Sequence, residues 1–512
     1  MTFLESIDFE NLPSIPDYYR GKTVFMTGGT GFLGKVLIEK LLYSCPDLDR
    51  IYLLLRPKKG MNPEQRLSAI YASNCFDRLR EERPNIFESK VFFIAGDCGE
   101  LRLGLSEEDR ALLINRTHII YHAAASVRFD DPLKASVKLN LRGTIEMIEL
   151  ANHVQNLECF VHVSTSYANT NRNLIEEVMY PAHDNWRELL NICEDIDDHT
   201  LNVLTPKYIG GMPNTYVFVK QLAEHVVYEQ KGKLPVVITR PSVVVASISE
   251  PVPGWMGNFN GPIGLIIASS KGILHTVYGD PKITADYIPV DVAIKSFVVA
   301  SWIRGTKKLE KTDDVPIYNT CNGSMGFRVT NEEIFLLGHD TIASYPLDNM
   351  IWSVGGTITS NKSIHYIKIL LLHVLPALFL DTLLWIFGKK TMVLKIQRRI
   401  YSANVALQLF LTKEWTFSNK NYLSLRSKIK EVDKQHFFYI MENIDIREYF
   451  KDAIIGARRY LLHEKDENLP KARVHYKRVT LLDKIVRTLF YSYIFWKVIH
   501  TNFVRNLFVN VL

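Results

Sequence analysis

Residues 23–35 read TVFMTGGTGFLGK, and this stretch decides how the rest of the chain is interpreted. Apolar and small residues lead to a threonine, and glycines then recur at every third position. The pattern predicts a strand, a tight turn and the start of a helix, in which glycines let the backbone approach a pyrophosphate and free helix amides bind its charge. The residues expected at this turn are Thr27, Gly28, Thr30, Gly31, Phe32, Leu33 and Gly34.

The composition of the 512 residues is that of a globular protein. Apolar residues make up 47% and charged residues 23%, which is hydrophobic enough for a core. The net charge of +6 is modest, and no basic stripe interleaved with aromatic residues is present, so we expect no nucleic-acid partner. The six cysteines are scattered without a CxxC pair, so we expect reduced thiols and no metal site. The first twenty residues lack a secretory signal, which predicts a cytosolic main body.

Further apolar runs of strand length alternate with helical stretches at residues 50–56, 91–97, 118–125, 159–164 and 236–241. This alternation predicts an α/β protein with a doubly wound parallel sheet, that is, a Rossmann fold. Because ligands of such sheets bind at the carboxyl ends of the strands, residues at these ends are candidates for the same site. They are Arg56, Asp97, Cys98, Ala123, Ala124, Pro241 and Ser242, together with Asn140 in the helix after the fourth strand.

The end of the second predicted strand distinguishes between two dinucleotide cofactors. An acidic residue there selects a free ribose 2′-hydroxyl, whereas a basic residue accommodates a 2′-phosphate. The position holds Arg56, followed by Lys58 and Lys59. A solvated basic loop is the alternative interpretation. We expect NADP(H) rather than NAD(H), and NADPH as the form used.

A Tyr-x-x-x-Lys pair, Tyr216 and Lys220, falls on a predicted helix between the fifth and sixth strands, which places both side chains on one face. A lysine ammonium is expected to lower the pKa of a neighbouring phenol from about 10, as suits a proton donor. Ser164 and Thr165 end the preceding strand. Together these residues predict hydride transfer, with Lys220 orienting the cofactor, Tyr216 protonating oxygen, and Thr165 in preference to Ser164 binding the carbonyl. Surface residues and ordinary strand-end hydroxyls are the alternative.

The glycine turn and the Tyr/Lys pair resemble those of extended short-chain dehydrogenases/reductases. The strings HAAASVRFDD (122–131), VHVSTSYANTN (161–171), RPSVV (240–244), PVPGWMGNFNGPIG (251–264) and ADYIPVDV (285–292) are similar to alcohol-forming fatty acyl-CoA reductases. The resemblance extends over nearly the whole chain. It implies two NADPH-dependent reductions, from long-chain fatty acyl-CoA to a bound aldehyde and then to a primary fatty alcohol, with release of CoA. Gly29 and Val219 depart from the family pattern without removing a catalytic group.

Residues 369–387 (ILLLHVLPALFLDTLLWIF) form an apolar run long enough to cross a bilayer. The run contains His373, Pro376 and Asp381, and an acidic residue at the membrane centre is costly. Basic residues follow it, which favours a cytosolic location for that flank too. We therefore expect a re-entrant or interfacial segment; a simple span and a buried core helix are the alternatives. The aromatic stretch from 489 onward predicts an amphipathic end of the chain.

We expect three domains: an NADP-binding reductase domain over 1–345 that includes the substrate-binding part, a mainly helical domain over 346–475 that contains 369–387, and an amphipathic, hydrophobic tail over 476–512. Trp255 and Phe259, in a segment rich in glycine and proline, are the candidates for contact with the substrate.

The expected partners are a long-chain acyl-CoA and a membrane lipid surface, and a homodimer is left open. The expected location is an intracellular membrane, of the endoplasmic reticulum or the peroxisome, with the catalytic domain facing the cytosol. Two other functions are left open. One is a membrane-associated NADP-dependent dehydrogenase or epimerase acting on a sterol or a sugar nucleotide. The other is a nucleotide-binding membrane protein without catalysis, although such a protein has no need of the retained hydroxyl, Tyr and Lys.

Overall fold

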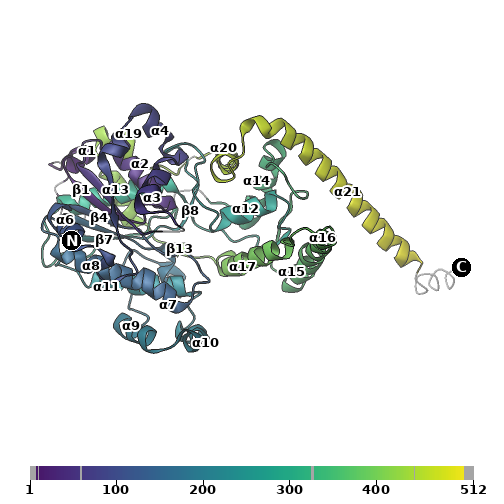
Figure 1. Ribbon diagram of the computed structural model, residues 1–512, viewed down its shortest axis with the longest axis horizontal. Coiled ribbons are helices and arrows are strands. Elements are labelled where there is room, and N and C mark those ends of the chain that lie inside the picture. The colour runs from purple at the N-terminus through teal and green to yellow at the C-terminus, as the bar shows by residue number, and fades with distance from the viewer. Residues whose placement is uncertain are drawn as a thin grey trace. The chain divides into compact units, whose positions relative to one another are not determined.

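A computed structural model describes residues 7, 9, 11–57, 60–323, 328–442 and 444–500 (Figure 1). The chain forms two compact units. Unit 1 comprises residues 1–258, 284–329 and 413–456, and unit 2 comprises 259–283, 330–412 and 457–512. The chain therefore passes between the units several times. The three domain boundaries expected from the sequence stay a prediction.

Unit 1 is built on a seven-stranded sheet with the order β11-β7-β5-β4-β1-β2-β3, in which all neighbouring strands are parallel. Its strands are β1 (Thr23–Thr27), β2 (Arg50–Leu55), β3 (Val91–Ala95), β4 (Ile119–His122), β5 (Cys159–Val163), β7 (Val236–Thr239) and β11 (Ile317–Tyr318). The strand order changes direction between β1 and β4, the place where doubly wound sheets bind their ligands. The predicted fold class is confirmed.

Helices cover this sheet because its strands are mainly apolar and most of their residues are buried, which requires cover on both faces. α2 (Phe32–Ser44) packs against α13 (Val290–Thr306), and α8 (Gly143–His153) packs against α11 (Thr215–Tyr228). In Figure 1 the second pair, α8 and α11, lies below the labelled strands β4 and β7. The glycine turn and the Tyr/Lys pair thus belong to elements that pack on one sheet.

The remaining elements of unit 1 are short helices and strands around the sheet. The helices are α1 (Ile15–Tyr19), α3 (Pro63–Tyr71), η2 (Asn74–Phe76), α4 (Asp77–Glu82), α5 (Ile86–Lys90), η3 (Leu101–Gly104), α6 (Glu107–Arg116), α7 (Leu133–Ser136), η4 (Val137–Arg142), η5 (Ser166–Asn169), α9 (Trp186–Asp195), α10 (Asp198–Tyr208), α18 (Lys420–Ser427), α19 (Glu431–Phe437) and α20 (Ile446–Gly456). Two parallel strand pairs complete the unit: β6 (Leu174–Ile175) with β13 (Thr416–Phe417), and β8 (Val243–Val245) with β10 (Tyr287–Pro289).

Unit 2 is mainly helical, as expected for the C-terminal part of the chain. Its elements are α12 (Pro262–Ser270), β9 (Thr276–Tyr278), α14 (Asn331–Ser344), β12 (Thr357–Thr359), α15 (Lys362–Ile369), η6 (Leu370–Val374), α16 (Leu375–Ile386), α17 (Val393–Thr412), η7 (Ala457–Leu461), η8 (Asp466–Asn468) and α21 (Leu469–Ile499). β9 and β12 are parallel. Leu265, Leu274 and Val277 form a small buried core against which side chains of α14 and α17 pack.

Within the described residues, one helix is long and apolar enough to cross a membrane. It runs from Lys362 to Ile386 through α15, η6 and α16, and only 17% of its apolar window is buried. Most of the apolar run 369–387 is thus helical, as expected from its sequence.

Candidate functional site

The glycine turn between β1 and α2 is shaped by close backbone contacts. Gly28 has φ = +78°, and a Cβ added there would lie 2.7 Å from the carbonyl carbon of Ala123. A Cβ on Gly34 would lie 2.3 Å from the carbonyl oxygen of Gly28. Gly31 precedes α2 and supplies no side-chain cap, so the first amides of α2 keep their capacity to bind an anion. The turn fits the pyrophosphate of a dinucleotide.

Two predicted cofactor residues instead hold the loop that follows β4. The buried Thr27 hydroxyl lies 2.8 Å from His122 Nδ1 and accepts a hydrogen bond of 3.2 Å from the Ala124 amide. The Asn140 side chain accepts from the Ser126 amide at 2.8 Å and donates to the Ser126 carbonyl at 3.0 Å. Both side chains fix the backbone at residues 123–126. Any direct contact that they make with a cofactor stays a prediction.

The end of β2 carries two arginines and one carboxylate. Arg56 forms an ion pair of 2.9 Å with Asp97, and about half of its side chain is exposed. Arg66, on α3, donates to the Arg56 carbonyl and lies 3.4 Å from the Thr30 hydroxyl. The Arg56 guanidinium and the Gly99 amide help to keep the pKa of Asp97 below its usual value, against the opposing effect of burial. Two cations therefore lie beside the glycine turn. Cys98, the next residue, is buried.

Tyr216 and Lys220 both lie on α11, one turn apart. Lys220 is buried, and its Nζ donates to the Val163 carbonyl at 2.7 Å, which places it under the end of β5. Burial lowers the pKa of Lys220 to about 8, while the nearby Glu224 carboxylate acts in the opposite direction. Lys220 thus remains at the boundary between charged and neutral near physiological pH.

The pKa of Tyr216 does not follow the expectation. Burial raises it above the usual value, and a hydrogen bond from the Thr165 side chain opposes that rise. The expected lowering by Lys220 was therefore wrong, because loss of hydration penalises the phenolate and the Lys220 ammonium is bonded to the β5 backbone. A raised pKa keeps Tyr216 protonated at neutral pH, so it can still donate a proton.

The hydroxyl pair at the end of β5 is buried next to this tyrosine. Thr165 accepts a hydrogen bond of 3.2 Å from the Tyr167 amide, which starts η5, and it contacts Tyr216. Ser164 is 4% exposed, and its hydroxyl has no hydrogen-bond partner within the described part of the chain. Across from them, the carbonyl of Pro241 accepts from the Ser166 amide at 3.0 Å. The structure brings the predicted hydroxyls, the Tyr/Lys pair and the 241–242 loop to one edge of the sheet.

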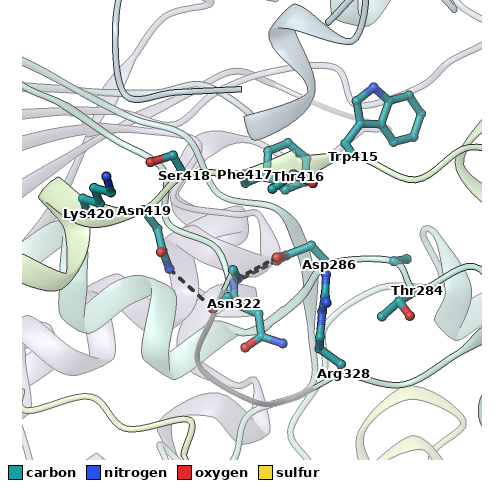
Figure 2. A pocket seen from close by; sticks show the side chains of 12 residues that line it. Thr284, Asp286, Asn322, Arg328, Trp415, Thr416, Phe417, Ser418, Asn419 and Lys420 are labelled. Atoms are coloured by element: carbon teal, nitrogen blue, oxygen red, sulfur yellow. Dashed lines mark hydrogen bonds between the residues drawn. The ribbon is translucent and has the colours of Figure 1, made fainter. Parts of the chain in front are cut away.

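A cavity of about 350 Å³ opens in unit 1 near this edge (Figure 2). It is lined by Thr284, Ala285, Asp286, Asn322, Gly323, Arg328, Trp415, Thr416, Phe417, Ser418, Asn419 and Lys420. Asp286 accepts from the Asn322 amide at 2.8 Å, and Asn419 donates to the Asn322 carbonyl. Burial raises the pKa of Asp286.

The cavity belongs to the carboxyl-end side of the sheet. The Val243 amide donates to the Asp286 carbonyl at 3.1 Å, and the Ser242 amide donates to the Thr320 carbonyl at 3.0 Å. The loops after β7 and β11 therefore build one wall, beside the predicted cofactor residues Pro241 and Ser242. Two exposed cations, Arg328 and Lys420, stand among the lining residues.

Comparisons with known proteins identify the family of the chain. A model of an NAD-binding family, described as male sterility protein, matches residues 26–297, and a second model with that description matches 372–464. Fatty acyl-CoA reductase 1 of Homo sapiens is 40% identical over 472 residues, 91% of this chain and 90% of the relative. The chain belongs to the fatty acyl-CoA reductase family. Fatty acyl-CoA reductase wat of Drosophila melanogaster is 35% identical, over 94% of this chain and 92% of its own. The family predicted from the sequence is confirmed.

Solved reductase domains share the fold of this fatty acyl-CoA reductase. The reductase domain of a nonribosomal peptide synthetase from Mycobacterium tuberculosis has a TM-score of 0.56 at 18% identity, covering 89% of this chain and 96% of its own. The terminal reductase domain of the myxalamid pathway has a TM-score of 0.55 at 17% identity, covering 87% and 92%. At such identities the likeness concerns the fold alone. The NAD-binding family model and the glycine turn identify the cofactor as a nicotinamide dinucleotide.

The two candidate substrate residues of this reductase have different surroundings. Trp255 is 2% exposed and packs on Phe32, with ring centroids 5.3 Å apart, so it supports the start of α2. Phe259 is 51% exposed and belongs to unit 2. Trp255 thus lies behind the glycine turn. Contact of either residue with substrate stays a prediction.

Sequence reasoning missed two features of the reductase site. Arg66 lies ten residues beyond Arg56, and nothing in the surrounding sequence distinguishes it from other basic surface residues. Glu224, one turn after Lys220, forms a fully buried ion pair with Arg240, with bonds of 2.9 and 2.7 Å. A Glu four residues after the Lys was a usable signal, since such spacing places both residues on one helix face.

Proposed function

We propose that this protein reduces long-chain fatty acyl-CoA to a primary fatty alcohol with NADPH, through a bound aldehyde and with release of CoA. The observation that carries the proposal is the meeting of Tyr216, Lys220 and Thr165 at the sheet edge that also holds the glycine turn. The identity of 40% to a protein named fatty acyl-CoA reductase 1 supplies the substrate class.

The preference for NADPH is supported by the charges at the end of β2. A 2′-phosphate adds negative charge at this position, and among the described residues Arg56 and Arg66 are cations beside it. Asp97 forms a direct ion pair with Arg56, whereas Arg66 donates to the Arg56 carbonyl and the Thr30 hydroxyl and interacts with Asp97 only from a greater distance. We infer that Arg66 carries at least as much of the selection as Arg56.

The bound cofactor supplies the hydride, and the residues of the chain control the proton and the carbonyl. In the first reduction the leaving thiolate has a conjugate acid with a pKa of about 8.5, so its departure needs little acid assistance. The second reduction produces an alkoxide, which needs a proton. Tyr216, kept protonated by burial, donates it. Thr165 hydrogen-bonds the carbonyl oxygen, with the neighbouring Ser164 as the second hydroxyl, and Lys220 orients the ribose.

The cavity beside Ser242 is proposed to receive the polar arm of the acyl-CoA. Its lining combines amide and hydroxyl groups with the aromatic rings of Trp415 and Phe417, which suits the amide chain of CoA. The exposed Arg328 and Lys420 are suited to its phosphate groups. Trp255 and Phe259 remain proposed contacts of the substrate near the thioester.

The apolar helix of unit 2 supports association with a lipid surface. We propose an intracellular membrane, of the endoplasmic reticulum or the peroxisome, with the reductase site facing the cytosol. Long-chain acyl substrates and alcohol products concentrate in lipid, so a membrane-bound reductase meets both where they are abundant.

The test is to incubate membranes containing the protein with NADPH and a panel of acyl-CoAs and to identify the alcohols formed. We expect long-chain alcohols and free CoA with NADPH, and much less product with NADH. Oxidation of NADPH without an alcohol product, or with a sterol or sugar nucleotide as the only effective substrate, would overturn the proposal.

A further inference from the structure

The apolar helix of unit 2 turns its two histidines and its aspartate to one face. Between Lys362 and Ile386 the side chains that are buried are His365, His373, Ala377 and Asp381, each at most 8% exposed. They are spaced by eight, four and four residues, so they form one stripe along the helix. This stripe faces the protein and contains the residues that make a membrane span unfavourable.

Each polar member of the stripe is bonded within unit 2. His365 Nδ1 lies 3.2 Å from the Thr276 hydroxyl, and His373 Nε2 accepts from the His275 amide at 2.9 Å. The Asp381 carboxylate accepts three backbone amides, those of residues 392, 393 and 394, at 2.9, 2.9 and 3.0 Å. These amides begin α17, so Asp381 acts as an anionic cap of the following helix. The cap joins α16 and α17 in a hairpin.

The second helix of the hairpin returns to the same core from which the first one leaves. On α17, Gln397 donates to the Ile273 carbonyl at 3.1 Å, and Asn404 donates to the Thr276 carbonyl at 3.3 Å. Ile400 and Leu407 pack against the core around Leu265. Both helices are therefore bonded to residues 273–276, at and before β9. If the helix 362–386 crossed the membrane, the segments before and after it would lie on opposite sides of the bilayer.

The opposite side of the helix is apolar and exposed. Its exposed large apolar residues are Ile364, Tyr366, Ile367, Leu370, Leu371, Leu372, Leu375, Leu378, Phe379, Leu380, Trp385 and Ile386, and Phe387 follows directly. The polar Lys362 and Ser363 at its start and Thr382 near its end are exposed as well. The exposed fractions of Phe379, Trp385 and Phe387 are 64%, 72% and 73%. A continuous apolar face of this extent is unusual on a soluble protein and indicates an apolar partner.

Basic residues adjoin the apolar face. Lys389 and Lys390 lie in the hairpin turn, and Lys395, Arg398 and Arg399 are exposed on α17. Aromatic side chains at the edge of an apolar face, with lysine and arginine beside them, are typical of helices that lie in the lipid interface. The positive charge favours a surface with anionic headgroups.

We propose that the helix 362–386 is an in-plane membrane anchor: it lies along the surface of one leaflet, with its polar stripe on unit 2 and its apolar face in the lipid. The inference deepens the membrane association within the proposed function, and its contacts are independent of the catalytic residues. It explains how an apolar run of 25 residues can contain two histidines and an aspartate.

The depth of two labelled positions tests the geometry. All six native cysteines are buried, so Leu371→Cys and Trp385→Cys, at exposed positions, allow selective labelling with an environment-sensitive fluorophore on the full-length protein. The two positions are about 21 Å apart along the helix axis. On vesicles with depth-graded quenching lipids we expect equal, shallow depths. Depths that differ by about 20 Å, or absence of lipid quenching, would overturn the proposal.

Vesicle binding tests the face itself. Phe379→Glu with Trp385→Glu should weaken partitioning into phosphatidylcholine–phosphatidylserine vesicles at least about tenfold. The matched control, Leu101→Glu with Val203→Glu, changes two residues of unit 1 that are each 68% exposed and should leave partitioning unchanged. Equal partitioning of both variants contradicts the proposal. A second result would also contradict it: the Phe379→Glu, Trp385→Glu variant loses a dimer in light scattering but binds lipid as before. In that case a second copy of the chain, and not lipid, would cover the apolar face.

The anchor and the reductase activity can fail separately. Turnover of an acyl-CoA short enough to stay in solution should be unchanged in the Phe379→Glu, Trp385→Glu variant. If the wild-type protein reduces no acyl-CoA, the proposed function is wrong while the label depths still decide the anchor. If turnover is normal and the labels show a span, the anchor alone is wrong.

Discussion

The carboxyl-end edge of the sheet in unit 1 and the apolar helix of unit 2 both place polar groups in apolar surroundings, with opposite consequences. At the sheet edge the buried Ser164 hydroxyl has no partner among the described residues, and the pKa of Lys220 is lowered by burial. On the helix, His365, His373 and Asp381 are all bonded to unit 2.

The difference shows which partner each region lacks. Burying a polar group without a hydrogen bond is costly, so an orphaned hydroxyl at a strand end indicates a polar ligand. Leaving apolar side chains in water also costs free energy. A helix whose buried polar groups are hydrogen-bonded and whose apolar face is exposed therefore indicates an apolar partner. Substitutions at the sheet edge should therefore change chemistry, and those on the helix should change location.

The largest effect is expected for Tyr216→Phe. Loss of the proton donor should reduce the conversion of aldehyde to alcohol by about 10² to 10⁴-fold, and acyl-CoA consumption by no more than that. Alcohol and aldehyde are quantified by gas chromatography. Vesicle binding should not change, which separates the two regions. A fully active variant would show that Tyr216 is not the proton donor.

The next effect concerns cofactor choice. Arg66→Ala should raise the KM for NADPH by about ten- to a hundredfold, since hydrogen bonds to charged groups contribute about 1.5–3 kcal/mol, and the KM for NADH should change little. Arg56→Ala should have an equal or smaller effect, because Asp97 already neutralises part of its charge. Arg187→Ala, at an exposed position on α9, gives a control outside the glycine turn. Equal losses with both cofactors would refute the selectivity role.

Lys220 predicts a dependence on pH. Since burial lowers its pKa to about 8, kcat/KM should fall about tenfold per pH unit above that value as the ammonium is lost. Between about pH 8 and the usual value near 10.5 the unfolded chain binds the proton that the folded protein has released, so this group's contribution to the free energy of unfolding rises with pH. Activity and stability should therefore move in opposite directions. If the Lys220→Arg variant is active, its kcat/KM should no longer fall in this pH range, because arginine stays charged.

The smallest effect is expected at the cavity. Arg328→Ala with Lys420→Ala should raise the KM for acyl-CoA by about five- to tenfold and weaken its salt dependence, because exposed charge pairs contribute about 1 kcal/mol each at most. The KM for free aldehyde, which lacks phosphate groups, should stay constant. Steady-state kinetics at two salt concentrations measure both values. A parallel rise for aldehyde would place the cavity outside the CoA-binding region.

The grouping of the candidate site residues could be predicted because they occupy strand ends. In a parallel sheet these ends meet at one edge, so Arg56, Thr165 and Ser242 could be grouped from the sequence. The roles of Thr27 and Asn140 were less accessible, since a side chain that binds a loop and one that binds a ligand have the same sequence pattern. Arg66 was missed because its proximity to Thr30 arises from the packing of α3.

By itself the sequence determined the parallel sheet and the glycine turn, since strand periodicity and glycine spacing are local properties. Its longer strings, such as residues 122–131 and 251–264, carried the resemblance to the fatty acyl-CoA reductase family. Only the tertiary structure decided that the pKa of Tyr216 is raised and that the Asp381 side chain points toward the start of α17. Both depend on desolvation and on hydrogen bonds between segments distant in sequence. An aspartate within an apolar run looks costly in the sequence, and it becomes a helix cap once α17 folds back onto it.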